Sequence, residues 1–297
     1  MKHLLLLAAV TGLVFLVACD AGEKNMEEVP KFDKLLQSYK DDPTRANADS
    51  LTTYTLGNPH LFEEEPEKVE IAIEVAAEAF FRESMRRLFI NYLQVREYSE
   101  IPDALLFLAQ VHEEQLADPR VANFFYLNFV EEFPDDPRWD SIEAKLPEQW
   151  TTTEELISEA GSGIYGSDGT ILNRGNANDF MLLAELYAIS KPESPNAPDY
   201  LFQAAEVAKS FELYDRSIFN SRWVIDGFPE HDMAANALFF KAFTIDESGV
   251  NQRRAHELYE KFLERFPEHP FAESAEVLKQ KGAYSDDQLL EMLRATQ

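Results

Sequence analysis

The sequence predicts an all-α protein, a solenoid of helical hairpins that follows a cleaved signal peptide. Three observations predict this fold class: an apolar run that ends at the first cysteine, a helical apolar periodicity, and an internal repeat of that periodicity. The 297 residues are 45% hydrophobic and 12% aromatic, so the chain can bury a sizeable core and wholesale disorder is not expected.

The amino terminus has the pattern of an export signal. A short basic start precedes the uncharged apolar run Leu4 to Phe15, which is too short for a comfortable membrane span. The run ends in Leu-Val-Ala-Cys19, which closely resembles the bacterial lipobox, where the cysteine becomes the lipidated first residue. We therefore expect residues 1–18 to be removed and Cys19 to carry acyl chains, with an uncleaved anchor as the alternative. Cys19 is the only cysteine, so the chain forms no intramolecular disulfide.

The clearest hairpin is predicted at 237–270. Its two helices carry apolar residues at spacings of three and four. The first stripe is Leu238, Phe239, Ala242, Phe243 and Ile245, and the second is Ala255, Leu258, Tyr259, Phe262, Leu263 and Phe266. Gly249 breaks between the helices, and Pro267 ends the second one because proline cannot continue a helix.

The same pattern recurs twice. Residues 104–137 match 237–270 without a gap, including Ala109 with Ala242 and Phe133-Pro134 with Phe266-Pro267. A third copy ends at Phe228-Pro229, and its helices are predicted around Leu201 to Ala208 and Ser217 to Val224. Matching apolar, small and helix-ending positions over a whole hairpin indicate an internal repeat.

These residues resemble the tetratricopeptide repeats of bacterial envelope lipoproteins, which close each repeat with Phe-Pro or Tyr-Pro and a polar pair. The resemblance covers about 193–282 best, and 100–137 and 67–97 more weakly. The chain is similar to the outer-membrane β-barrel assembly lipoprotein with tandem repeats and to the Tol-Pal and cell-division coordinator proteins. The resemblance implies a protein-binding scaffold.

The patterns divide the chain into six segments. They are the signal peptide (1–18), a lipidated N-terminus with an acidic tether and one weak helix at 31–39 (19–66, with loops at 57–59 and 63–66), N-terminal hairpins (67–137), a helical insert with a glycine-rich loop at 161–176 (138–192), the tetratricopeptide-like repeats (193–282), and a C-terminal capping helix (283–297).

The charge balance narrows the partner class. The formal charge is -27, from 54 acidic against 27 basic residues. Such a surface repels phosphates, so we expect no nucleic acid partner, whereas cationic polypeptide segments are favoured. The alternative is a generally solvated acidic surface, of the kind found in salt-adapted proteins.

The sequence predicts no catalytic, metal or cofactor site. The glycine-rich loop lacks the lysine and hydroxyl residue of a phosphate loop, and it lacks the ligand pattern of a calcium loop. His231 and His269 occupy equivalent turns, where we expect them to be solvated. We therefore expect no enzyme; the alternative is a hydrolase acting on peptidoglycan, with 138–192 as its catalytic insert.

By the resemblance, the first helix of each hairpin lines an inner groove. The groove residues would be Leu106, Gln110, Glu113, Phe202, Glu206, Lys209, Asn236, Phe239, Phe243 and Asp246. Aromatic anchors among carboxylates suit a peptide with apolar and basic side chains. In the alternative interpretation, the three phenylalanines are buried between hairpins, and the carboxylates only form a solvated face.

The expected function is a non-enzymatic scaffold that binds other envelope proteins or peptide segments and that Cys19 anchors by lipid. The alternative within this class is a component of a β-barrel assembly or division-linked complex. The expected location is the periplasmic face of the outer membrane. Asp20 resembles the inner-membrane retention signal of enteric bacteria, so the inner membrane remains the alternative. The oligomeric state is not predicted.

Overall fold

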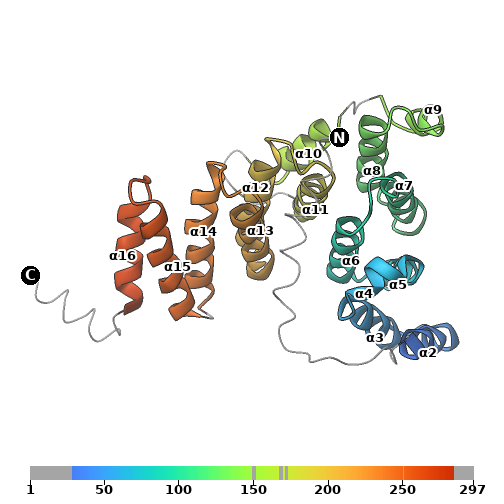
Figure 1. Ribbon diagram of the computed structural model, residues 1–297, viewed down its shortest axis with the longest axis horizontal. Helices are drawn as coiled ribbons and strands as arrows, with labels where there is room; N and C mark the ends of the chain where they lie inside the picture. The colour runs from blue at the N-terminus through green and yellow to red at the C-terminus, as the bar shows by residue number, and fades with distance from the viewer. Residues whose placement is uncertain (1–28, 149–151, 167–169, 171–172, 250, 284–297) are drawn as a thin grey trace, which may run out of the picture. The chain divides into compact units, whose positions relative to one another are not determined.

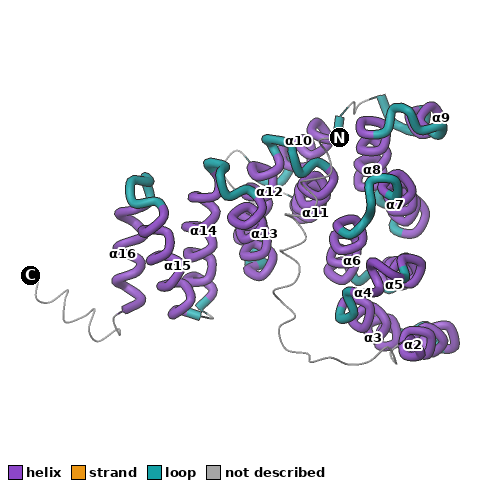
Figure 2. Tube along the Cα trace, in the orientation of Figure 1, coloured by secondary structure: helices purple, strands orange, loops and turns teal. Residues whose placement is uncertain are grey.

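The chain is built from helices joined by short turns (Figures 1 and 2). The computed structural model describes residues 29–148, 152–166, 170, 173–249 and 251–283, and every regular element within them is helical. The all-α prediction is therefore confirmed. Within the described residues, none of the helices is both long and apolar enough to span a bilayer. Cys19, the signal segment and nearly all of the predicted capping helix lie outside the described ranges.

The described helices form two compact units, residues 29–192 and residues 193–283. The first unit contains α2 (Val29–Asp41), α3 (Arg45–Leu56), α4 (His60–Glu64), α5 (Pro66–Glu78), α6 (Arg82–Gln94), α7 (Ile101–Gln110), the π-helical turn η2 (Val111–Gln115), α8 (Pro119–Glu132), α9 (Trp139–Glu143), α10 (Thr153–Ser162) and α11 (Arg174–Ser190). The second contains α12 (Ala197–Ser210), α13 (Tyr214–Gly227), α14 (Met233–Ser248), α15 (Gln252–Arg265) and α16 (Ala272–Ala283).

In the second unit each helix packs on the next one along the chain, from α12 to α16. The hairpin predicted at 237–270 is α14 and α15, which pack on each other. The buried members of the two stripes are Leu238, Ala242 and Ile245 on α14, and Ala255, Leu258, Tyr259 and Phe262 on α15. Because these positions recur every three or four residues, each helix buries one face and leaves the other to solvent. In addition, α12 packs on α14, so the first helices of successive hairpins are neighbours.

In the first unit, the hairpins are α2–α3, α5–α6, α7–α8 and α10–α11. Helix α3 joins the first hairpin to the second by packing on α5 and α6. Helix α11 contacts both α6 and α8, which are far from it in sequence. This unit therefore combines sequential hairpins with long-range helix contacts.

The segment before residue 66 is more helical than the sequence predicts. The weak helix expected at 31–39 is α2, but α3 and α4 follow it. The predicted loop at 63–66 is wrong, since Glu63 and Glu64 belong to α4 and α5 begins at Pro66. Helix α3 has no continuous apolar stripe because its buried residues include Thr52 and Thr55.

The glycine-rich loop is shorter than the predicted 161–176. Helix α10 continues to Ser162, and α11 begins at Arg174. The start of α11 is fixed by Asn173, whose side chain accepts a hydrogen bond of 3.1 Å from the backbone N–H of Asn176. Helix α10 begins after Thr152, whose hydroxyl accepts a hydrogen bond of 3.2 Å from the Glu155 backbone N–H.

A left-handed residue marks the turn inside four of the hairpins. These residues are Phe80 (φ 55°), Ala117 (φ 50°), Glu212 (φ 59°) and Gly249 (φ 69°). They are the positive-φ residues of the described chain, and each lies between the two helices of its hairpin. Only glycine adopts this conformation without steric cost. The four hairpins therefore share a turn conformation that only one of them marks by a glycine.

The Phe-Pro dipeptides end their helices in one shared geometry. Phe133, Phe228 and Phe266 have φ between -133° and -127° and ψ between 53° and 58°. Each donates its backbone N–H to the carbonyl four residues earlier, at 3.0, 3.0 and 2.8 Å, respectively. The following proline then prevents another helical turn.

The internal repeat is also visible in the burial of matching residues. Ala109 and Ala242 are fully buried, as are Phe129 and Phe262. The matching tyrosines, Tyr126 and Tyr259, are also buried. The small residues allow close helix crossings, and the aromatic rings fill the space beside them. The two matched sequences therefore fold as hairpins with equivalent cores.

Candidate functional site

Seven of the residues predicted for the groove lie on α12 and α14 in the second unit. We define the α12–α14 face by Phe202, Glu206, Lys209, Phe239, Phe243, Asp246 and Glu247. Phe202, Phe239 and Phe243 are neither fully buried nor fully exposed. Each ring therefore packs in part against its neighbours, and groove lining by the exposed part stays a prediction.

Phe239 is the most deeply integrated of the three rings. It packs 4.8 Å from Phe271, 5.6 Å from Phe262 and 6.0 Å from Tyr259, measured between ring centroids. It also stacks on Phe243, with a centroid distance of 6.4 Å and an interplanar angle of 4°. Phe239 therefore joins α14 to α15 and to the residue just before α16.

Phe202 and Phe243 link α12 to α14. The ring of Phe202 meets Phe240 edge-on at 5.5 Å. The Lys209 ammonium lies 4.8 Å from the centroid of Phe243 and forms a salt bridge with Glu247. These contacts place aromatic rings, a lysine and a carboxylate side by side across two neighbouring helices.

The remaining predicted residues of the second unit differ in role. Glu206 is exposed, and partial desolvation raises the pKa of its carboxyl group. The Asn236 amide donates to the Met233 sulfur at 3.5 Å. The Asp246 carbonyl accepts from the Gly249 N–H at 3.1 Å, so its backbone helps to end α14.

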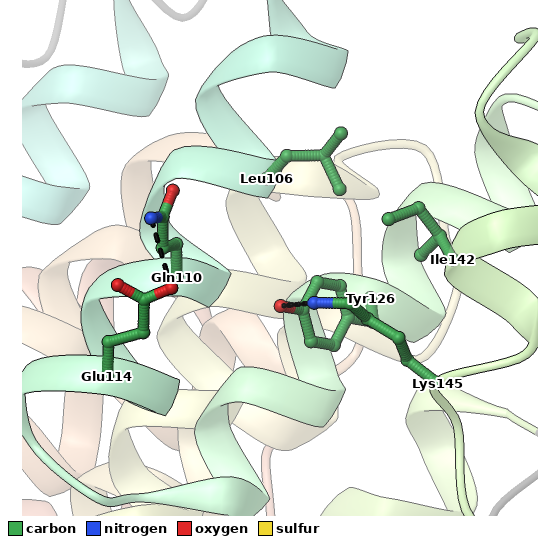
Figure 3. Close-up of a pocket in the computed structure, with 6 residues that line it drawn as sticks. All are labelled: Leu106, Gln110, Glu114, Tyr126, Ile142 and Lys145. Carbon is green, nitrogen blue, oxygen red and sulfur yellow. Dashed lines mark hydrogen bonds between the residues drawn. The ribbon is translucent and has the colours of Figure 1, made fainter.

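The predicted residues of the early repeat surround a pocket in the first unit (Figure 3). The pocket has a volume of about 300 Å³ and is lined by Leu106, Gln110, Glu114, Tyr126, Ile142 and Lys145. Leu106 and Gln110 belong to the predicted set. Glu113, the third predicted residue, lies beside the pocket and is hydrogen-bonded to two of its lining residues. The pocket belongs to the first unit and the α12–α14 face to the second.

Tyr126, Glu113 and Lys145 form a closed hydrogen-bond network. The Tyr126 hydroxyl donates to Glu113 at 2.6 Å, and the Lys145 ammonium donates to Tyr126 at 3.1 Å and to Glu113 at 3.2 Å. Hydrogen bonds from Tyr126 and Lys145 lower the pKa of Glu113. Burial and the hydrogen bond to Glu113 raise the pKa of Tyr126, and the hydrogen bond to Tyr126 raises that of Lys145.

Sequence reasoning did not single out Ile142 and Lys145 as site residues. Both follow the Phe-Pro turn, in and just after the short helix α9, where no repeat match guides the assignment. Phe271 was missed for the same reason, because it lies between the last repeat and α16. The sequence contains no signal that relates Lys145 to Tyr126.

The histidines at the repeat turns have a structural role. Nδ1 of His231 accepts a hydrogen bond from the Met233 N–H, and Nδ1 of His269 accepts one from the Phe271 N–H, both at 3.2 Å. Asp136 accepts the equivalent bond from Arg138 at 2.9 Å. Among the described residues, no group of histidine and acidic side chains is arranged to hold a metal ion.

Charged groups do gather beside the glycine-rich loop. Arg120 donates to Asp179 at 3.0 Å and to Asn176 at 2.9 Å, and lies 3.7 Å from Glu159. Burial, followed by the charge of Asp118, raises the pKa of Asp179. These ion pairs join α8 to α10 and α11, so they stabilise the packing of the first unit.

No protein-family model matches the chain, and no curated protein matches it either. The repeat assignment therefore rests on the matched hairpins, their shared turns and their equivalent cores.

Proposed function

We propose that the protein is a non-enzymatic scaffold of the tetratricopeptide-repeat type that captures segments of other polypeptides. The observation that carries this proposal is the α12–α14 face. It presents partly exposed aromatic rings beside carboxylates, on helices fixed by a packed core. Partly exposed aromatic rings next to charged groups are typical anchors for a bound peptide.

The acidic character of the chain supports the same function. With a net charge of -27, the protein attracts basic and amphipathic segments and repels nucleic acid. The Lys209–Glu247 pair gives the face a polar position beside Phe243, which would fix the register of a bound segment.

The membrane attachment belongs to the same proposal. The lipobox-like sequence ending at Cys19 supports a lipid anchor in a bacterial envelope, with the periplasmic face of the outer membrane as its site. A β-barrel assembly or division-linked complex is the setting that the repeat resemblance favours. An anchored scaffold holds its partners at the membrane without acting on them.

Site-specific photo-cross-linking tests the proposal. Benzoylphenylalanine replaces Phe243 on the α12–α14 face or, as a control, Phe219, which is exposed on α13. We expect a defined set of envelope polypeptides to cross-link at 243 and not at 219. The same adducts at both positions, or none at 243, would show that this face does not bind polypeptides.

A further inference from the structure

The pocket of the first unit has two unlike walls. Gln110 and Glu114 lie on one side of it, and Ile142 and Lys145 lie on the other (Figure 3). Leu106 and Ile142 supply apolar surface, while Glu114 supplies a carboxylate at the rim. An occupant that satisfies both walls needs an aliphatic part and a polar end.

The pocket already contains the contacts that suit an ammonium group. The Lys145 ammonium lies 4.8 Å from the centroid of the Tyr126 ring and donates to Glu113 at 3.2 Å. An aromatic face and a carboxylate are the two groups that bind such cations in proteins.

Glu114 has no cation of its own. Its carboxylate accepts a hydrogen bond of 3.1 Å from the Gln110 amide, and it contacts no lysine or arginine in the part of the chain that the structure describes. A purely apolar occupant would desolvate this carboxylate without replacing its water, which is unfavourable. An acidic occupant would be repelled, because the two carboxylates of Glu113 and Glu114 outweigh the single positive charge of Lys145. A basic side chain avoids both costs.

We propose that this pocket binds a lysine or arginine side chain of a partner polypeptide. The methylene groups of the entering side chain lie on Leu106 and Ile142, and its cationic end pairs with Glu114. Lysine and arginine combine an apolar stem with a charged head, so they match the two walls. The inference rests on the proposed function in taking the partner to be a polypeptide.

Lys145 is then a tethered competitor for the same site. It follows α9, and its ammonium occupies Glu113, the second carboxylate beside the pocket. Lys145 therefore offsets the charge that Glu113 would offer to an entering cation. Removing the Lys145 charge therefore frees a second carboxylate and tightens binding.

The probe is n-butylammonium, with n-butanol as a neutral compound of the same shape. Binding to the purified protein is followed by methyl NMR of Leu106 and Ile142. We expect butylammonium to shift both methyl signals saturably and butanol to bind more weakly. Glu114→Gln should weaken the ammonium about tenfold, the usual loss on removing a charge-assisted hydrogen bond. Glu67→Gln, which removes the same charge from an exposed site on α5, should have no effect, and Lys145→Met should tighten binding.

Equal affinities for butylammonium and butanol would overturn the proposal, and so would an unchanged affinity in Glu114→Gln. This result is separable from the proposed function because the cross-linking at Phe243 probes the other unit. Cross-linking without ammonium binding would support the scaffold and refute the binding of basic side chains in the pocket. Ammonium binding without cross-linking would leave the pocket and remove the α12–α14 face as the docking surface.

Discussion

The Arg86 guanidinium lies 3.2 Å from the Glu185 carboxylate, although the two residues are 99 positions apart in the sequence. The Glu185 side chain is fully buried, and that of Arg86 is 8% exposed. Burial opposes the charge of Arg86, but Glu185 and Glu83 outweigh it and raise the pKa of the guanidinium. This ion pair fixes α11 against α6 in the interior of the first unit.

Breaking this pair should destabilise the first unit strongly. Arg86→Ala removes the guanidinium that lies 3.2 Å from the buried Glu185 carboxylate, so we expect a loss of about 3–5 kcal/mol in the free energy of unfolding. Urea unfolding followed by far-ultraviolet circular dichroism measures it. The control is Arg87→Ala, an exposed neighbour, whose effect should stay within about 0.5 kcal/mol. A small loss in Arg86→Ala would mean that Glu185 is solvated.

The left-handed turns predict opposite effects of glycine and alanine. At Gly249, a Cβ atom would meet no other atom within 4 Å, so Gly249→Ala tests the backbone alone. We expect it to cost about 1 kcal/mol in unfolding free energy because φ is 69° there. Ala117→Gly relieves the same strain but frees the unfolded chain, so its effect should be a gain of about 0.5 kcal/mol or less. Destabilisation by Ala117→Gly would contradict the shared-turn assignment.

Lys241 predicts a pH dependence on the alkaline side. Burial lowers its pKa from 10.5 to about 8, with Asp226 opposing the shift and Arg222, Arg254 and Lys261 adding to it. Below pH 8 the lysine is charged in both the folded and unfolded states, so the folded state bears the full penalty. Between about pH 8 and 10.5 only the unfolded state binds the proton, so stability rises with pH.

Lys241→Met should remove this rise and increase stability at neutral pH by about 2 kcal/mol. The measurement is the difference between the variant and the parent in unfolding free energy from pH 7 to 10.5, which cancels the other titrating groups. A constant difference across this range would show that Lys241 is well hydrated.

Alanine substitutions of Phe239 and Phe243 should differ in their effects on stability and on peptide binding. Phe239 contacts three rings outside α14, so we expect Phe239→Ala to cost about 3 kcal/mol in unfolding free energy. Phe243→Ala removes a ring that meets Phe239 and Lys209, and it should cost about 1–2 kcal/mol while reducing peptide capture. Thermal unfolding and pull-down of cross-linked partners give the two readouts. Equal stability losses would place both rings in the core.

The proposed lipid anchor predicts that one substitution, Cys19→Ser, abolishes both lipidation and membrane attachment. Cys19→Ser removes the thiol that would accept the acyl chain, so incorporation of labelled palmitate should disappear and the protein should leave the membrane fraction. Substituting Ser38, which lies in α2, gives a folded control that stays lipidated. Unchanged membrane association of Cys19→Ser would overturn the anchor.

The sequence predicts the regular hairpins because their stripes are made of strongly apolar residues. Leu238 belongs to such a stripe on α14, Tyr259 and Phe262 belong to the stripe on α15, and all three are buried. Helix α3 is not predicted in this way, because polar residues occupy some of its buried positions. The buried Thr55 hydroxyl donates a hydrogen bond of 2.9 Å to the Leu51 carbonyl of the same helix. A polar residue can thus occupy a core position, and the sequence then shows no apolar pattern there.

The candidate sites are predictable only on the repeat helices. Leu106 and Gln110 follow from the position of α7 in its hairpin, whereas Lys145 reaches the pocket through the irregular chain after α9. Likewise, no local spacing relates Arg86 to Glu185, since their contact depends on how hairpins pack. Tertiary pairs of this kind leave no trace in helical periodicity.

The packing of α11 on α6 and α8 bears on the order in which the protein folds during synthesis. Helix α6 leaves the ribosome long before α11, so the side of α6 that carries Arg86 stays in water until residue 185 has been added. The second unit has no such delay, because each helix finds its main partner in the helix made just before or after it. We therefore expect the first unit to be the slow step and the interval before α11 appears to be the time when the nascent chain most needs chaperone protection.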